Sequence, residues 1–169
     1  MQCTQRKNTI GTYKKIAKLI PAGSRVLDYG AGHCLGAELL GADSYEPNPR
    51  IDVSPTYQAS HLIPKGVYDA VVCNCVLNVI DTPSWRGVAL RLIVDALRPG
   101  GKAYIMVRSW SDVMGSNTSP EGDGFRMSTG SFQRGFSFSE LEKLVSPFGT
   151  TERISEVSNI GILLTIPIR

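Results

Sequence analysis

Residues 25–34 read RVLDYGAGHC and join a short hydrophobic run to a glycine-rich turn. The pattern predicts a strand over Arg25–Asp28 and, after the turn, a helix over Leu35–Leu40 that ends at Gly41. Glycines let a ligand approach the backbone closely. Asp28 can accept hydrogen bonds from a bound ammonium group or from ordered water, whereas a phosphate-binding turn would present backbone N–H groups to negative charge. The stretch therefore predicts a ligand site that does not bind a pyrophosphate.

Strands and helices alternate on both sides of this stretch. Apolar residues recur at helical spacing over Thr9–Ile20, with lysines opposite them, and predict an amphipathic helix. The other predicted elements are strands at 44–45, 69–73, 102–107, 150–157 and 160–168, a helix at 83–97 that the turn at 98–101 ends, and a helix capped by Ser137 or Ser139 that runs to Val145. This alternation predicts an α/β fold: a doubly wound, mostly parallel seven-stranded sheet with helices on both faces and an antiparallel C-terminal strand.

Two segments differ in composition from this framework. Residues 1–22 contain basic residues and no acidic one, and they predict a basic N-terminal helical cap. Residues 109–136 have no clear period and contain five glycines, which predicts a long loop on the substrate side. No repeat or linker divides the chain, so we expect residues 1–169 to form one domain.

The composition excludes several classes of protein. The chain has 169 residues, of which 42% are hydrophobic and 20% charged, and its net charge is +3. These values are typical of a soluble globular domain and not of a collagen, a coiled coil or a disordered tail. No apolar run is long enough to span a membrane, and we expect a cytoplasmic protein. The four cysteines form no C-x-x-C pair and only two histidines accompany them, so we expect reduced thiols and no metal site.

Polar side chains follow three of the predicted strands. Asp28 ends the first strand, and Glu46 follows the second, where its carboxylate can accept hydrogen bonds from both hydroxyls of a ribose. The run Asp69–Cys73 is almost continuously apolar, as in a strand that is buried on both faces of a parallel sheet, and it leads to Asn74. In a doubly wound sheet the ligand crevice lies outside the carboxyl ends of the strands, so we expect the function there.

These motifs, in this order, resemble those of the class I S-adenosylmethionine-dependent methyltransferases, and the resemblance covers nearly the whole chain. Val26–Gly32 is similar to the nucleotide-loop motif of that family, and Glu46 to its ribose-binding acid. Tyr68–Asn78 is similar to its fourth-strand motif, and Leu97–Lys102 to the turn before its fifth strand. The resemblance implies a Rossmann-like fold, S-adenosylmethionine as the cofactor and methyl transfer as the activity.

The resemblance also implies which residues bind the cofactor. Asp28, Gly30 and Gly32 would face its methionine part, and Glu46 would bind its ribose. Gln58 or Ser60 would flank the adenine. The complete set of implied cofactor residues is Asp28, Tyr29, Gly30, Ala31, Gly32, Glu46, Gln58, Ser60 and Asn74.

The chain departs from the family pattern in two places. Cys34 stands where a third glycine is common, so the first turn of the helix must accommodate a side chain, and we expect Gly36 to restore some of the room. The family often has an acid near the adenine, and this chain has none there. A finer similarity, over Val76–Ile80 and Gly130–Phe136, is to small methyltransferases of phages and mobile elements.

The acceptor side differs from that of amino-directed DNA methyltransferases. Those enzymes carry an Asp/Asn-Pro-Pro-aromatic sequence after the fourth strand, whereas residues 73–76 read CNCV here. A cytosine-directed enzyme needs a thiolate nucleophile, usually beside proline, and Cys75 lacks that context, so we expect it to act as a small hydrophobic residue. Methyl transfer from a sulfonium depends mainly on positioning, so no base is required. We therefore assign no catalytic residue and keep Asn74 and Arg108 as candidates.

Candidate substrate-binding residues lie in the predicted loop, and they are Trp110, Arg126, Phe132, Gln133 and Arg134. The two arginines can bind a phosphate or a carboxylate, and Phe132 can stack on a base. The alternative is that the arginines are solvated and that Phe132 anchors the core.

Four functions remain open at this point. The first is methyl transfer to a small-molecule or nucleotide-type acceptor, because residues 1–169 leave no separate target-recognition domain. The second is methylation of a DNA or RNA base, which is favoured by the basic opening segment and by the arginines, Phe132 and Gln133 of the predicted loop, and which predicts salt-sensitive binding. The third is a catalytically silent module that binds S-adenosylmethionine, and the fourth is another reaction of that cofactor. The sequence does not predict the oligomeric state.

Overall fold

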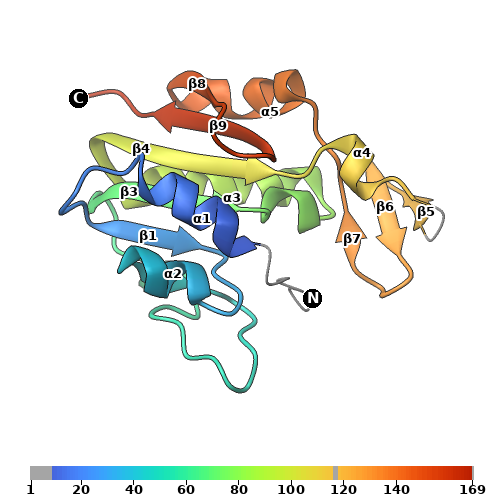
Figure 1. Ribbon diagram of the computed structural model, residues 1–169, viewed down its shortest axis with the longest axis horizontal. Helices are drawn as coiled ribbons and strands as arrows, with labels where there is room; N and C mark the ends of the chain where they lie inside the picture. The colour runs from blue at the N-terminus through green and yellow to red at the C-terminus, as the bar shows by residue number, and fades with distance from the viewer. Residues whose placement is uncertain (1–8, 116–117, 169) are drawn as a thin grey trace.

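A six-stranded sheet forms the centre of the fold in the computed structural model, which describes residues 9–115 and 118–168 (Figure 1). Its strands are β1 (Val26–Tyr29), β2 (Asp43–Tyr45), β3 (Tyr68–Asn74), β4 (Leu97–Val107), β8 (Thr150–Ile154) and β9 (Ile160–Thr165). The strand order is β2-β1-β3-β4-β9-β8. The first four of these strands are parallel, and β9 runs antiparallel to both β4 and β8.

The prediction of seven strands is wrong by one for the described residues. Residues 46–67, between β2 and β3, form only a 3-10 helix, η1 (Ser60–Leu62), and one isolated bridge, from Tyr57 to Tyr45. This segment contains four prolines, which cannot donate a backbone hydrogen bond to a neighbouring strand. The sheet therefore ends at β2 on this side.

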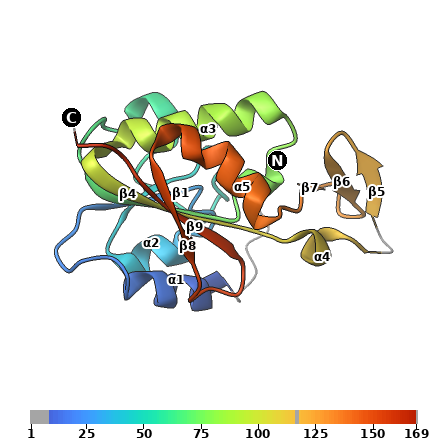
Figure 2. The same cartoon turned by 90° about the horizontal axis from the view of Figure 1, so that it is seen from above.

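Helices cover both faces of the sheet, as a doubly wound fold requires (Figure 2). The helices are α1 (Thr9–Ala17), α2 (Leu35–Leu40), α3 (Pro83–Ala96) and α5 (Phe138–Val145). Figure 2 shows α3 and α5 on one face and α1 and α2 on the other. The predicted helices are confirmed, although α1 ends three residues before the predicted Ile20. Residues 1–8 of the predicted basic cap lie outside the described residues.

Two apolar layers lie between the sheet and these helices. Leu27 and Val71 belong to the layer under α3 and α5, whereas Val26 and Val72 belong to the layer under α1. Because successive side chains of a strand point to opposite faces, Asp28 lies on the α1 face with Val26. Neighbouring residues of each buried strand are therefore divided between the two layers.

Strand β4 begins earlier than predicted. Leu97 already pairs with Tyr68, and the register shifts before Lys102 pairs with Ala70. The predicted turn at 98–101 is thus a bulge within the strand, in which Gly100 has a φ of 75°, a conformation that favours glycine. The pattern indicated the irregularity but not that pairing resumes on both sides of it.

The prediction that residues 109–136 form a long loop is wrong. They form a short helix, α4 (Trp110–Val113), and three antiparallel strands, β5 (Thr118–Glu121), β6 (Gly124–Met127) and β7 (Phe132–Gln133). We call these three strands the accessory sheet. Gly122 and Gly130, in its two turns, have positive φ angles of 56° and 82°. The glycines that suggested irregular structure therefore permit tight turns between short strands. The accessory sheet lies beyond the carboxyl end of β4 (Figures 1 and 2).

Candidate functional site

The glycine loop after β1 is tied to the end of β2. The backbone N–H groups of Gly30 and Ala31 donate to the Tyr45 carbonyl at 2.8 and 2.9 Å. The Gly32 N–H donates to Oε2 of Glu46 at 2.9 Å, and the Asn48 N–H donates to Oε1 at 3.1 Å. Each Glu46 oxygen therefore keeps capacity to accept a further bond. The loop and the buried Glu46 carboxylate lie together at the carboxyl edge of the sheet.

Asp28 is a fully buried carboxylic acid at the same edge. Its Oδ1 accepts a hydrogen bond of 2.8 Å from the hydroxyl of Tyr13, while Oδ2 is buried and has no hydrogen-bond partner among the described residues. Burial raises the pKa of Asp28 to about 7, and the neighbouring Glu46 charge raises it too. The hydrogen bond from the Tyr13 hydroxyl and the nearby backbone N–H of Ala37 oppose this rise. The site thus contains an acid that titrates near neutral pH.

Two buried asparagines follow β3. Asn74 is 4% exposed, and within the described part of the chain both its amide nitrogen and its amide oxygen are buried without a partner. It lies two residues after Val72 and therefore on the α1 face, as Asp28 does on the neighbouring strand β1. Asn78, in the 3-10 helix η2 (Leu77–Val79), donates from Nδ2 to Oε1 of Gln133 at 2.9 Å, and its Oδ1 has no partner. A buried polar group without a partner costs about 1–3 kcal/mol, so such a group indicates a ligand.

The turn after β3 packs directly on the glycine loop. A Cβ atom at Gly30 would lie 2.4 Å from a Val76 methyl group, and Gly30 has a φ of 77°. Cys34, in the position of the family's third glycine, has a left-handed φ of 59°. The expected room at Gly36 is filled by the ring of Tyr13, because a Cβ there would lie 2.3 Å from a ring carbon. Glycine at position 36 therefore serves the packing of α1.

The other implied cofactor residues are of two kinds. The side chain of Tyr29 is buried in the layer under α3 and packs on Tyr45 with ring centroids 4.9 Å apart, and Ala31 is fully buried beside α2. Gln58 is exposed and Ser60 half-buried, in the segment that runs alongside the end of β2. The structure thus brings the glycine loop and the segment that contains Gln58 and Ser60 to the edge where Asp28 and Glu46 lie.

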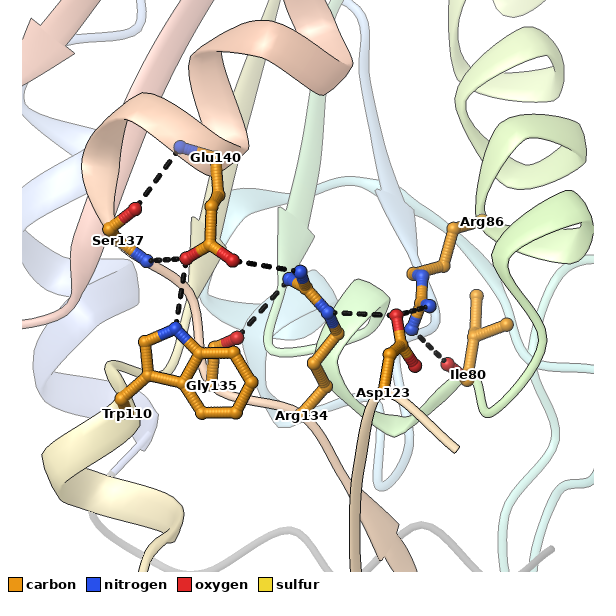
Figure 3. A network of polar contacts seen from close by, with 8 residues as sticks. All are labelled: Ile80, Arg86, Trp110, Asp123, Arg134, Gly135, Ser137 and Glu140. Atoms are coloured by element: carbon orange, nitrogen blue, oxygen red, sulfur yellow. Dashed lines mark hydrogen bonds and ion pairs between the residues drawn. The ribbon is translucent and has the colours of Figure 1, made fainter. Parts of the chain in front are cut away.

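Arg134, predicted as a substrate ligand, is the centre of a polar network (Figure 3). Its Nε donates to Asp123 and its Nη2 to Glu140, each at 3.0 Å, and its guanidinium lies over the rings of Trp110 and Phe136. Burial raises the pKa of Glu140, but bonds from the Ser137 backbone, Trp110, the Ser137 hydroxyl and Arg134 outweigh it and lower the pKa to about 2. Arg134 therefore joins the accessory sheet to α5.

The same network reaches α3 through Asp123 (Figure 3). Asp123, in the turn between β5 and β6, also forms an ion pair with Arg86, whose side chain is 4% exposed. Arg86 donates in addition to the carbonyl of Ile80 at 2.9 Å. Trp110, the second predicted substrate residue in this network, donates from Nε1 to Glu140 at 2.9 Å. These contacts fix the accessory sheet to the carboxyl edge.

The remaining substrate candidates lie within the accessory sheet. Arg126 forms an ion pair with Glu121 on the neighbouring strand and donates to the Gly130 carbonyl at 3.0 Å. Phe132 is 1% exposed, as the core-anchoring alternative predicts. Gln133 is 8% exposed and bonds Asn78 as described above. Of this set, Gln133 lies against the turn that packs on the glycine loop.

The catalytic candidate Arg108 and the two cysteines at the end of β3, Cys73 and Cys75, occupy structural positions. Arg108 donates to the carbonyl of Asp112 and so binds the end of α4. Cys73 is fully buried, and burial raises its pKa far above the ordinary thiol value, so its thiolate is not formed at neutral pH. The Cys75 sulfur accepts a hydrogen bond from Asn159 at 3.1 Å. Within the described ranges, no group of three or more His, Cys, Asp or Glu side chains could hold a metal ion.

A pocket lies at the opposite edge of the sheet. A pocket of about 390 Å³ opens at the amino ends of β3 and β4, where Asp69, Arg98 and Lys102 contribute to its lining. Arg98 already forms an ion pair with Asp69 at 2.6 Å. Unlike the carboxyl edge, this pocket contains no buried side-chain polar atom without a partner among the described residues.

None of the described helices is long and apolar enough to cross a membrane.

Sequence reasoning missed several residues around the site. The helical spacing over Thr9–Ile20 places Tyr13 on the apolar face of the helix, and a buried phenol usually has a hydrogen-bond partner, which is the signal that was available for its role. Asn78 lay inside the fourth-strand motif without an assigned role. The ion pair of Arg86 and Asp123 gave no signal, because the two residues are 37 positions apart. Glu140 was indicated only as a residue of the first turn of α5, and its bonds to Trp110 and Arg134 were missed.

Comparison with solved structures places this fold among methyltransferases. A Burkholderia thailandensis 1,6-didemethyltoxoflavin-N1-methyltransferase, determined with 1,6-didemethyltoxoflavin and S-adenosylhomocysteine, superposes with a TM-score of 0.68 at 15% identity, over 92% of this chain and 78% of that one. A sugar N-methyltransferase from Streptoalloteichus gives 0.67 at 17% identity, over 94% and 86%. An amino pentose methyltransferase from Micromonospora echinaspora with bound S-adenosylmethionine gives 0.66 at 14%, over 94% and 89%.

The sequence itself matches no family model and no curated protein. The finer similarity to proteins of phages and mobile elements stays a prediction. At these identities the superpositions establish the fold, and the chain therefore has the class I fold of S-adenosylmethionine-dependent methyltransferases.

Proposed function

We propose that this protein binds S-adenosylmethionine at the carboxyl edge of its sheet and transfers the methyl group to a small-molecule or nucleotide-type acceptor. The observation that carries the proposal is the pair of buried side chains, Asp28 and Asn74, whose polar atoms lack partners on adjacent strands beside the glycine loop. The burial of three such atoms destabilises the free protein, so it indicates a compensating interaction with a ligand. A ligand with polar groups at this position would supply the missing bonds.

The residues present fit this cofactor. Asp28 can accept a hydrogen bond from the ammonium of the methionine part, and the Asn74 amide can both donate and accept. Glu46, held by the N–H groups of Gly32 and Asn48, keeps lone pairs for the ribose hydroxyls. Gln58 and Ser60 would flank the adenine. When bound, S-adenosylmethionine supplies a methyl group on a sulfonium, activated for in-line displacement.

The chain's own contribution to the reaction is positioning. Asp28, Asn74 and Glu46 would hold the donor, and the accessory sheet, fixed by the network around Arg134, would bound the space for the acceptor. Placing two reactants in line accounts for a large part of the rate enhancement in such displacements, so a dedicated base is not needed.

Two observations favour a small acceptor. The neighbours named above act on 1,6-didemethyltoxoflavin and on sugars. Arg126 and Arg134, the residues that suggested binding of a nucleic-acid phosphate, are engaged with carboxylates of the chain itself. The alternative of a DNA or RNA acceptor rests on the exposed lysines of α1, Lys14 and Lys15.

Calorimetric titration with S-adenosylmethionine and S-adenosylhomocysteine tests the cofactor site. We expect both to bind the wild-type protein, and we expect Asp28→Ala and Glu46→Ala each to weaken binding while the fold stays intact. Asp43→Asn is the matched control, because Asp43 begins β2 at the opposite edge, where it accepts a bond from Tyr68 at 2.7 Å. If neither compound binds the wild type, the proposal is wrong.

Incubation with methyl-labelled cofactor and fractionated cell extract tests the acceptor class. The proposal predicts label in the small-molecule fraction. Label in a nuclease-sensitive fraction would favour the nucleic-acid alternative, and binding without any labelled product would favour a silent cofactor-binding module.

A further inference from the structure

Helix α1 reaches the candidate cofactor site through one side chain. Tyr13 is 1% exposed, and its hydroxyl donates to Oδ1 of Asp28 at 2.8 Å. Its ring occupies the space that a side chain at position 36 would need, since a Cβ there would lie 2.3 Å from Cζ of the ring. Tyr13 is thus held on one side by α2 and bonded on the other to the end of β1. Such double restraint fixes the position of the hydroxyl.

The bond from Tyr13 decides which Asp28 oxygen remains available. Oδ1 is engaged by the hydroxyl, while Oδ2 is buried and without a partner. A carboxylate held at one oxygen loses the rotational freedom that would let either oxygen face a ligand. The Tyr13 hydroxyl stays a donor, because burial and the Asp28 charge both raise its pKa well above the ordinary value.

The surroundings of Asp28 give this bond a second effect. Among the residues that the structure describes, the titratable groups that face Asp28 are Tyr13 from α1, Cys34 before α2, Glu46 after β2 and Cys73 in β3. None of these four is a cation, so none provides the opposite charge that usually stabilises a buried carboxylate. The Tyr13 hydroxyl is the strongest of the contacts that favour the ionised form. Its loss would leave Asp28 more often protonated.

We infer that Tyr13 is a positioning residue for cofactor binding, which holds the Asp28 carboxylate so that Oδ2 meets the ammonium of the methionine part. The inference rests on the proposed function. It makes α1 a component of the cofactor site, although Tyr13 itself does not contact the ligand.

The expected signature is a shift in the pH dependence of cofactor affinity. An ammonium binds the ionised form of Asp28, so the affinity should rise with pH through the pKa of that acid, which is about 7. Tyr13→Phe removes a bond that favours the charged form, so the rise should move to higher pH, by about one unit. Below the midpoint the variant should then bind up to about tenfold more weakly. At high pH, where Asp28 is ionised in both proteins, only the smaller loss that comes from the freer carboxylate should remain.

Calorimetric titration of S-adenosylhomocysteine into the wild type, Tyr13→Phe and Tyr104→Phe, from about pH 5.5 to 8.5, tests the inference. Tyr104 is the matched control: it lies in the same apolar layer, is 2% exposed, and its hydroxyl donates to the carbonyl of Leu19 at 3.0 Å. We expect the Tyr104→Phe profile to coincide with that of the wild type. Tyr13→Phe keeps the ring that fills the space at Gly36, so its fold should be preserved, which thermal unfolding verifies.

Three outcomes overturn the inference. A uniform loss of affinity in Tyr13→Phe at every pH would mean that Tyr13 only supports the fold. An unchanged profile would mean that it does not act on Asp28. In the background of Asp28→Asn, which cannot titrate, Tyr13→Phe should cause no further pH shift, and a remaining shift would assign the effect to another group. Failure of the wild type to bind at any pH would instead refute the proposed function.

Discussion

Two regions at the carboxyl edge differ in whether their polar side chains have hydrogen-bond or ion-pair partners. Around the accessory sheet, Arg86, Asp123, Arg134 and Glu140 satisfy one another in a continuous network (Figure 3). At the ends of β1 and β3, Asp28 and Asn74 are buried with polar atoms that have no partner. Because polar groups in the first region are paired, the lack of partners at Asp28 and Asn74 is a specific feature of the second region.

The difference separates scaffold from site. Paired groups hold elements together, and their removal should cost stability without affecting a ligand. Unpaired groups cost stability in the free protein, and their removal should affect a ligand without destabilising the fold. Asn78 lies at the boundary, because its Nδ2 bonds the accessory sheet while its Oδ1 has no partner.

The largest effect should come from the centre of the network. Arg134→Ala leaves Asp123 and Glu140 without their shared cation and removes the stacking on Phe136, so we expect it to lower the free energy of unfolding by about 3 kcal/mol. The affinity for S-adenosylhomocysteine should stay within about twofold of the wild type. Urea denaturation and calorimetry measure the two quantities.

Arg153→Ala is the control for that substitution. Arg153 is exposed and its guanidinium lies 5.1 Å from the ring centroid of Phe138, so it shares the stacking contact but not the buried network. We expect it to change stability by less than about 1 kcal/mol. Equal losses in the two variants would show that the ion pairs of Arg134 contribute nothing.

The next effect concerns Asp28, whose contribution to stability depends on pH in the direction opposite to that of most carboxylates. The pKa of Asp28 is raised to about 7 in the folded protein, whereas it is about 4 in the unfolded chain. The free energy of unfolding therefore falls as the pH rises from about 4 towards 7. Asp28→Asn removes this cost. Its stability relative to the wild type should therefore increase by about 2 kcal/mol between pH 5 and pH 7 in ligand-free protein. A constant difference across that range, measured by urea denaturation, would contradict the assignment.

Asn74→Leu should separate binding from stability. The substitution replaces an amide without partners by an apolar group of the same branched shape, so the free energy of unfolding should stay equal or rise by about 1 kcal/mol. The affinity for S-adenosylhomocysteine should fall about tenfold, the equivalent of one lost hydrogen bond. A marked loss of stability with unchanged affinity would place Asn74 in the scaffold.

The smallest effect should come from Arg126. Its ion pair with Glu121 joins two exposed strands of the accessory sheet, and exposed pairs contribute little to stability. Arg126→Ala should therefore leave both the urea midpoint and the cofactor affinity nearly unchanged. An effect confined to the KM of the acceptor, once an acceptor is identified, would support the substrate role predicted from the sequence.

The framework of the fold was predictable because its signals are local. The alternation of apolar strands and amphipathic helices predicted the doubly wound sheet, and the strand-end rule brought Asp28, Glu46 and Asn74 to one edge. The sheet has one strand fewer than predicted because the prolines in residues 46–67 prevent regular pairing. The accessory sheet was missed since its strands are short and its glycines resemble those of a loop.

The network and the role of Tyr13 depend on contacts between distant residues. Arg86 and Asp123 are 37 positions apart, and Tyr13 and Asp28 are 15 apart. No periodicity encodes such pairs. Arg134 was therefore interpreted as a residue available to a substrate, whereas the structure engages it with two carboxylates.

Nuclear magnetic resonance tests the contrast between the two regions most directly. In ¹⁵N-labelled protein titrated with S-adenosylhomocysteine, we predict that the side-chain amide signals of Asn74 shift on binding. The indole Nε1–H signal of Trp110, which donates to Glu140 at 2.9 Å, should keep its position. Asn74→Leu and Trp110→Phe assign the two signals. An unmoved Asn74 amide at saturation would contradict the claim that the unpaired buried groups form the ligand site.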